Sequence, residues 1–204
     1  MKTLILYAHP GQQHSNANSD LVKATQTVEG VTFVDLYHRY PRHDIDVQRE
    51  QQQLLDHDVI VFQFPLMWYS TPSILKDWQD LVLEHGFAYG QGGEQLMGKY
   101  WLNAVTAGAP QPAYTAEGQN KHTLPEMLTP LQATARLCHM QYLPPYVLYG
   151  ALKPDSQAER TAHAEGYKAL LSSLSQDQFG LEAAQSVPEI SANSLTALIK
   201  GAVS

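Results

Sequence analysis

The sequence predicts an α/β fold of three layers, in which helices cover both faces of a five-stranded parallel sheet. Residues 59–64 form a run of β-branched and aromatic side chains that only Gln63 interrupts. A run this apolar is typical of a strand covered on both faces of a parallel sheet. Four further apolar stretches alternate with segments of helical periodicity, as strands joined by crossover helices do. These stretches are 3–8, 31–36, 100–106 and 140–149, the last broken by two prolines.

The first predicted strand leads into a polar turn that suits an anion. Residues 9–18 are rich in Pro, Gly, Ser and Asn, and Leu21 marks the helix that follows. A helix N-terminus binds anions, and Ser15, Asn16 or Asn18 can cap this one. The dinucleotide fingerprint GxGxxG is absent, so the turn fits a single phosphate and not a pyrophosphate. The alternative is a plain connecting loop with a capping residue.

The third predicted strand ends in a loop of bulky side chains. Pro65 ends the strand because it cannot donate to a central ladder. A helix is expected over 71–84, capped by Ser70 or Thr71. The residues between are Leu66, Met67, Trp68 and Tyr69. Large apolar groups beyond the carboxyl end of a strand indicate a flat aromatic ligand. The alternative is that Trp68 and Tyr69 pack on the domain's own core.

The second half of the chain adds one more candidate loop and a tail. The strand over 100–106 runs into TAGAPQPAY, where Gly108 permits close approach of the backbone and Thr106 offers a hydroxyl. Residues 111–123 lack periodicity, and a loop this long is usually functional or mobile. We expect further helices over 47–57, 124–137 and 155–174. Residues 1–174 are expected to form one domain, and 175–204 a tail that is either weakly helical or disordered.

Composition excludes several classes of protein. The 204 residues carry 13 Lys and Arg against 20 Asp and Glu, a net charge of −7, which argues against a nucleic-acid partner. No apolar run is long enough to span a bilayer, and the N-terminus reads as a strand and not a signal peptide. The single cysteine, Cys138, fits a reducing cytoplasm. The nine histidines form no ligand motif such as HExxH, so no metal is expected.

Strand order 2-1-3-4-5 would bring the three candidate loops together. Loops 9–18, 65–70 and 106–114 all follow the carboxyl ends of strands. In open α/β sheets ligands bind there, at the point where the strand order reverses, which is the flavin position of flavodoxin-like folds. The sequence therefore predicts one ligand site built from these three loops.

Several motifs in this chain resemble a known family. They are LYAHP at 6–10, QFPLMWYSTPSILKDW at 63–78, GFAYG at 86–90 and the TAG turn at 106–108. These motifs look like those of the flavodoxin-like NAD(P)H:quinone oxidoreductases, and the resemblance covers roughly residues 1–172. QGGEQLMGKYW, PLQATA and YLPPY resemble one bacterial branch of the family more closely. That branch comprises the ancillary flavoproteins of glutathione-regulated potassium-efflux systems.

The resemblance implies a bound flavin and a set of residues around it. FMN is expected, with FAD as the alternative, because the first loop suits one phosphate and no second-nucleotide site is evident. His9 and the run Ser15, Asn16, Ala17 and Asn18 would hold the phosphate and ribityl chain. Leu66, Met67, Trp68 and Tyr69 would pack on the isoalloxazine. Thr106, Ala107, Gly108 and Ala109 would run beside its polar edge.

The chain departs from the family pattern in two places. Ala107 and Ala109 stand where family members often carry a second Thr and a second Gly, so a hydroxyl contact is lost. Tyr114 falls on the family's active-site tyrosine and is the predicted catalytic residue. The histidine that partners it in the animal enzymes falls here on Asn120, with His122 two residues further on.

The resemblance implies two-electron reduction of quinones by NADH or NADPH, with the protein orienting the cofactor. The alternative is a regulatory subunit that binds a membrane potassium-efflux protein and has incidental redox activity. Either function would keep the protein in the cytoplasm, or peripheral on the inner membrane through that partner.

A homodimer is also expected. The glycine-punctuated stretch 86–101 holds four aromatic residues, which is more than one small domain readily covers. These are Phe87, Tyr89, Tyr100 and Trp101.

Overall fold

The computed structural model describes residues 1–11, 16–153 and 157–200, and for Asn16 only the backbone. Its sheet has the predicted order, β2-β1-β3-β4-β5, and every pairing is parallel. The strands are β1 (Thr3–Tyr7), β2 (Val31–Asp35), β3 (Val59–Pro65), β4 (Tyr100–Thr106), β5 (Gln141–Tyr142) and β6 (Tyr146–Leu148). Pro144 and Pro145 divide the fifth predicted strand into β5 and β6, both of which pair with β4.

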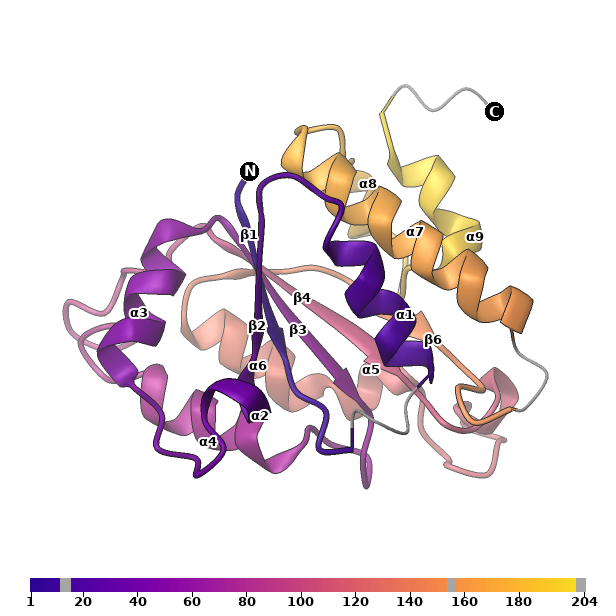
Figure 1. Cartoon of the computed structure of the whole chain (residues 1–204), viewed down its shortest axis with the longest axis horizontal. Coiled ribbons are helices and arrows are strands. Elements are labelled where there is room, and N and C mark those ends of the chain that lie inside the picture. The colour runs from indigo at the N-terminus through magenta and orange to yellow at the C-terminus, as the bar shows by residue number, and fades with distance from the viewer. Residues whose placement is uncertain (12–15, 154–156, 201–204) are drawn as a thin grey trace.

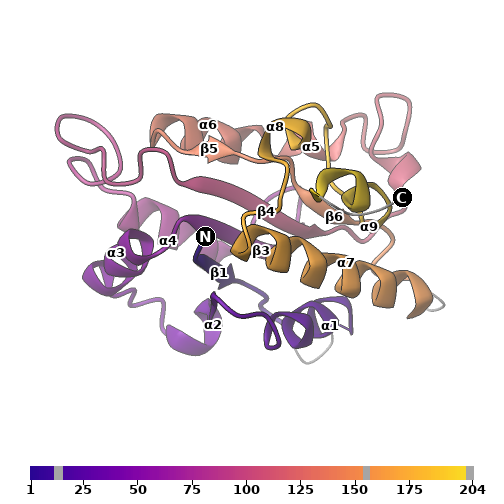
Figure 2. The same ribbon diagram turned by 90° about the horizontal axis from the view of Figure 1, so that it is seen from above.

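Helices lie on both faces of the sheet, as Figures 1 and 2 show. They are α1 (Asn16–Thr25), α2 (Leu36–Arg39), α3 (Val47–Asp56), α4 (Ser73–Val82), α5 (Leu124–Met127), α6 (Thr129–Leu137), α7 (Gln157–Ser175), α8 (Leu181–Ala184) and α9 (Ala192–Leu195), with 3₁₀ turns at Gln111–Ala113 and Thr196–Leu198. Alternate strand residues point to opposite faces, so each strand contributes to two cores. Phe62 and Trp101 pack with α3 to α6, and Val61 and Leu102 with α1 and α7 to α9.

Two helices differ from their predicted starts and lengths. α4 begins at Ser73 with Pro72 at the N-cap and no side-chain cap, so neither Ser70 nor Thr71 caps it. The helix expected over 124–137 is divided into α5 and α6 at Leu128. Proline in the first turn of α6 lacks an N–H and starts a new helix there.

The segment after α7 packs on the domain. Phe179, Ala184 and Ile190 are buried in the same core as α1 and α7. Figure 1 shows α9 beside α7, and the two helices are in contact. In the described parts of the chain, 1–11, 16–153 and 157–200, no helix has both the length and the hydropathy needed to cross a membrane.

Candidate functional site

A cavity of about 390 Å³ lies at the carboxyl ends of the central strands. The register sets Tyr7 beside Gln63, and Pro65 beside Thr106, so the loops after β1, β3 and β4 start close together. Loops after β1, β3, β4 and β6 and the first turns of α1 and α7 form the wall. The lining residues are His9, Gly11, Ala17, Asn18, Pro65, Leu66, Met67, Thr106, Gly108, Ala151, Leu152, Lys153 and Arg160. The volume lies within the range of small-molecule sites.

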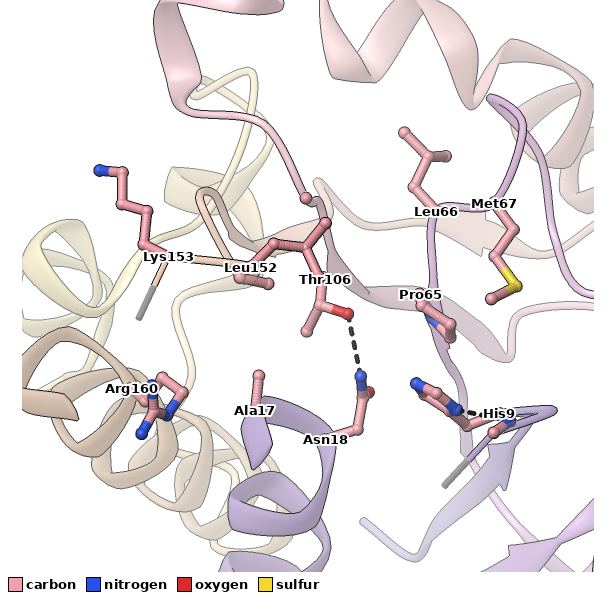
Figure 3. Close-up of a pocket in the computed structure, with 13 residues that line it drawn as sticks. His9, Ala17, Asn18, Pro65, Leu66, Met67, Thr106, Leu152, Lys153 and Arg160 are labelled. Carbon is pink, nitrogen blue, oxygen red and sulfur yellow. Dashed lines mark hydrogen bonds between the residues drawn. The ribbon is translucent and has the colours of Figure 1, made fainter. Parts of the chain in front are cut away.

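One side of the cavity is polar and cationic. Arg160 lies there beside the N-terminal turn of α1, and Lys153 lies further along the same side, with its ammonium pointing away from that turn (Figure 3). Arg160 is buried and meets Asp20 with 3.6 Å between Nε and Oδ2. No acidic residue lies in the first turn of α1, and none is among the described residues that line the cavity. A helix N-terminus with a guanidinium beside it favours an anionic group.

A hydrogen bond joins the α1 side of the cavity to β4. The Asn18 side-chain amide donates to Thr106 Oγ1 over 3.0 Å, and both side chains are buried. Figure 3 shows the two side chains pointing toward each other across the cavity floor. The bond fixes the rotamers of both residues, so their polar atoms are oriented before any ligand binds.

His9 supplies a neutral donor at the edge of the cavity. Its Nδ1 accepts a hydrogen bond from the Gly11 N–H over 3.1 Å, so the proton of the neutral ring lies on Nε2. The ring points into the cavity (Figure 3). Burial lowers the pKa of His9 below its usual value, and this effect exceeds that of the nearby Asp35 carboxylate, which raises it. The ring is therefore an N–H donor near neutral pH.

The opposite side of the cavity is apolar. Pro65, Leu66 and Met67 line it, on the far side from Lys153 and Arg160 (Figure 3). Leu152 closes over Gly108 between the two sides. A Cβ at Gly108 would lie 2.9 Å from Leu152 Cδ1, so a larger residue there would displace the exposed Leu152 side chain.

The structure brings together many of the predicted cofactor residues and leaves others out. His9, Ala17, Asn18, Leu66, Met67, Thr106 and Gly108 line the cavity. Ser15 lies outside the described residues, and Asn16 begins α1. Ala107 is buried, and its N–H donates to the Leu148 carbonyl, so that donor is used by the fold. Ala109 does not line the cavity, and its carbonyl accepts from the Gly150 N–H.

Trp68 and Tyr69 contradict the alternative that they pack on the domain's own core, and their contact with a flat ligand stays a prediction. They are 94% and 57% exposed, so neither packs on the core, and neither lines the cavity. Met67 and Ser70 exchange two backbone hydrogen bonds across them, and their φ angles are +48° and +63°. Positive φ at both central residues is the signature of a type I′ turn. The turn directs both rings outward, where the Tyr69 hydroxyl donates to the Asn120 amide oxygen over 3.4 Å.

Tyr114, the predicted catalytic residue, is buried outside the cavity. Its ring packs on Tyr149 with 5.4 Å between centroids. Burial raises the pKa of the Tyr114 phenol, against a smaller lowering by a hydrogen bond from the Ala109 backbone. His122 is exposed and lies 3.9 Å from the Glu126 carboxylate. The structure thus pairs Tyr114 with another tyrosine and not with His122.

Sequence reasoning missed Leu152, Lys153 and Arg160. They follow β6, which ends at the same sheet edge as β1, β3 and β4. Ligands bind beyond the carboxyl ends of strands, and the segment GALKP directly follows the last predicted strand. Its position therefore marked Leu152 and Lys153 as candidate site residues.

Among the described residues, the cavity lining combines hydrogen-bond donors with apolar surface and includes no cysteine or serine. Cys138 is buried elsewhere, and burial raises its pKa to about 11. The part of the chain that the structure describes holds no cluster of three or more His, Cys, Asp or Glu side chains suited to a metal ion. The arrangement therefore fits a ligand with an anionic end and a flat apolar end.

Comparisons with known proteins agree with this geometry. The family model described as Flavodoxin-like fold matches residues 1–171. The chain is 46% identical over 170 residues to the glutathione-regulated potassium-efflux system ancillary protein KefG of Cronobacter sakazakii, covering 83% of this chain and 92% of that protein. The general stress protein 14 of Treponema denticola, solved in complex with FMN, is 37% identical with a TM-score of 0.79 and covers 85% and 99% of the two chains. An NADPH-quinone reductase from P. pentosaceus is 34% identical with a TM-score of 0.73 and covers 84% and 98%.

Proposed function

Because this chain belongs to the family with the flavodoxin-like fold, we propose that it binds FMN and catalyses the two-electron reduction of quinones by NADH or NADPH. One observation carries the proposal. The cavity combines a cationic, N–H-rich side with an apolar side, and it lies where the strand order reverses. A relative that is 37% identical was solved with FMN, and one that is 34% identical is named as an NADPH-quinone reductase.

The residues present fit FMN by their chemistry. The first turn of α1, with Ser15 to Asn18, would hold the phosphate, and Arg160 and Lys153 would balance its charge. Thr106 and Gly108 would lie beside the polar edge of the ring. Leu66 and Met67 would contact the ring's apolar part and keep water away from it.

FMN would supply the hydride transfer, accepting two electrons from the nicotinamide and passing them to the quinone. This chain's own residues bind, orient and exclude water. Asn18 holds the Thr106 hydroxyl in a fixed direction, and the His9 Nε2–H is a donor at the cavity edge. Such preset donors cost no reorganisation when charge develops on a bound molecule.

Purification of the chain, followed by its absorption spectrum and chromatography of the cofactor released by denaturation, tests the FMN assignment. Recovery of FAD alone would overturn the choice of FMN. Oxidation of NADH and NADPH in the presence of quinones tests the activity. Thr106→Val removes the hydroxyl at the cavity floor with little change of volume, and we expect weaker FMN binding. The matched control is Thr27→Val, at an exposed position.

Tyr114 remains the proposed catalytic residue. Its hydroxyl would have to reach the cavity from its contact with Tyr149, and Tyr114→Phe keeps that ring contact while removing the hydroxyl. Equal quinone turnover in the variant and the parent would remove Tyr114 from the mechanism.

A second candidate function rests on the similarity to KefG. That relative is named as an ancillary protein of a potassium-efflux system, and the match covers 92% of its length. The chain would then bind a membrane potassium-efflux protein from the cytoplasm, either with quinone reduction or in place of it. Co-purification from membranes that contain the efflux protein tests this function. Quinone reductase activity without such binding would exclude the ancillary function and support the enzyme only.

A further inference from the structure

The segment 176–200 is built into the sheet beyond the family match, which ends at residue 171. Ile190 forms a parallel bridge with Tyr146. Its N–H donates to the Pro145 carbonyl over 2.8 Å, and its carbonyl accepts from the Val147 N–H over 3.0 Å. The segment thus pairs with β6. This pairing fixes the backbone next to Glu189.

The Glu189 carboxylate receives two hydrogen bonds from two different loops. The Tyr149 hydroxyl donates to Oε2 over 2.6 Å, and the Gln111 side-chain amide donates to Oε1 over 3.0 Å. Gln111 lies in the loop after β4, and Tyr149 directly follows β6. Burial, together with the hydrogen bond to Glu189, raises the pKa of Tyr149, so the phenol keeps the proton that it donates.

These two loops carry one wall of the candidate FMN cavity. Gly108 in the first loop and Leu152 and Lys153 in the second line it. Two backbone hydrogen bonds join the loops, from the Gly150 N–H to the Ala109 carbonyl and from the Ala151 N–H to the Ala107 carbonyl, each 2.9 Å long. The Glu189 bonds connect the loops again, through the side chains of Gln111 and Tyr149.

We propose that Glu189 is a positioning residue that holds the loop after β4 against the loop after β6 and so keeps the Gly108–Leu152 wall of the cavity closed on bound FMN. The inference deepens the proposed function and rests on it for the identity of the ligand. The loops also meet through the Ala107 N–H bond to the Leu148 carbonyl and through the Tyr114 ring on Tyr149, and Glu189 adds a side-chain connection to these contacts. A side chain outside the matched region would therefore tune cofactor retention in this chain.

Two readouts on the full chain test this proposal. The first is hydrogen–deuterium exchange, which needs no activity. In Glu189→Ala we expect amide exchange in 107–114 and 148–153 to rise about tenfold while β1 and β3 stay unchanged. The second is FMN affinity, followed by quenching of flavin fluorescence. We expect the Kd to rise about tenfold, while kcat at saturating FMN stays within about twofold.

Three further variants separate positioning from general loss of stability. Tyr149→Phe removes one donor and keeps the ring on Tyr114, so it should reproduce part of the effect of Glu189→Ala. The double variant Glu189→Ala, Tyr149→Phe should exchange little faster than Glu189→Ala alone, because both substitutions remove the same hydrogen bond. Glu189→Gln keeps an acceptor oxygen for the phenol and should recover part of the wild-type exchange. The matched control is Glu182→Ala, an exposed glutamate in the same segment.

Unchanged exchange in both loops of Glu189→Ala would overturn the proposal, and so would an equal rise across the whole chain. Unchanged FMN affinity with faster loop exchange would overturn the link to cofactor retention. A wild-type chain that binds no FMN would refute the proposed function, and exchange would still decide whether Glu189 holds the loops.

Discussion

Trp68 and Tyr69 occupy positions that usually select other residues. Both have positive φ, at +48° and +63°, in a two-residue turn closed by Met67 and Ser70. Asn and Gly are favoured there because they adopt positive φ with little strain, whereas each bulky residue costs about 1–3 kcal/mol. The rings are 94% and 57% exposed and gain little from burial in their own chain. A strained turn that displays two aromatic rings beside Met67 of the cavity is typical of a functional site.

Replacing both residues should therefore raise stability and lower function. We expect Trp68→Asn with Tyr69→Gly to increase the free energy of unfolding by about 2–6 kcal/mol, because the strain at both positions of the turn is relieved. Urea unfolding measures it, at a dilution where sedimentation shows both proteins to be monomers. Quinone turnover should fall, because rings this exposed are placed to contact a bound molecule or a partner. A double variant less stable than the parent would show that the two residues do not strain the turn.

His163 should make stability depend on pH. The side chain is 4% exposed and stacks on Tyr146 with 4.3 Å between centroids, and burial lowers its pKa to about 3. Free histidine titrates near pH 6.5. Between these pKa values the unfolded chain binds a proton that the native chain does not. The free energy of unfolding therefore falls as pH falls through 6.5, by up to about 1.4 kcal/mol per unit.

His163→Phe keeps a ring on Tyr146 and removes the titration. Between pH 4.5 and 6.5 we expect the slope of the unfolding free energy against pH to be smaller than in the parent by up to about 1.4 kcal/mol per pH unit. The control is His122→Phe, whose side chain is 68% exposed. Parallel curves for His163→Phe and the parent would show that burial of His163 has no linkage to folding.

At the scale of elements, a buried carboxylate joins three helices. Glu50 in α3 is fully buried and accepts hydrogen bonds from side chains of α2, α3 and α4. The donors are Arg39 Nη1 at 2.9 Å, the Tyr40 hydroxyl at 2.7 Å, Gln53 Nε2 at 3.0 Å and Trp78 Nε1 at 2.9 Å. Four donors compensate the desolvation of the carboxylate, and removing it would leave them unpaired.

Glu50→Ala should therefore destabilise the chain by about 3–5 kcal/mol, the usual loss when one partner of a buried ion pair is removed. The midpoint of denaturant unfolding measures it. Glu94→Ala, at an exposed position, is the control and should change stability by less than about 0.5 kcal/mol. A loss below 1 kcal/mol for Glu50→Ala would mean that water or the Arg39 side chain readily replaces the carboxylate.

The sequence predicted those elements whose cause is local. The apolar run at 59–64 became β3, and the alternation of strands and helices predicted the parallel sheet, whereas the strand order was expected because it brings the three candidate loops together. The burial of Glu50 could not be predicted from its polar helix, because its four donors come together only in the folded chain. The outward rings of Trp68 and Tyr69 depend on a backbone turn that their side chains disfavour. Lys153 and Arg160 reach the cavity through the placement of β6 and α7, which spacing alone does not give.

At the scale of the molecule, the structure changes the reason for expecting a dimer. Trp101 is fully buried under its own sheet, 4.1 Å from Phe62 between ring centroids. Phe87, Tyr89 and Tyr100 are half-buried. The stretch 86–101 therefore covers much of its own aromatic surface. Exposed apolar side chains beside the cavity belong instead to the turn at 67–69, with Met67 at 38% exposure, and to Leu152 at 84%.

We predict that this turn lies in a two-fold interface, so that each Trp68 contacts the partner copy near its cavity. Exposed aromatic rings are typical of the centres of interfaces, and two-fold symmetry would give two equivalent sites. Trp68→Glu should convert the dimer to monomer without loss of fold, because the side chain has almost no contact with its own chain. Sedimentation over a dilution series, run beside quinone turnover per flavin, measures both effects. Lys76→Glu, an exposed charge change on α4, is the control. A parent that sediments as a monomer with full turnover per flavin would remove the shared interface and leave the FMN cavity within one chain.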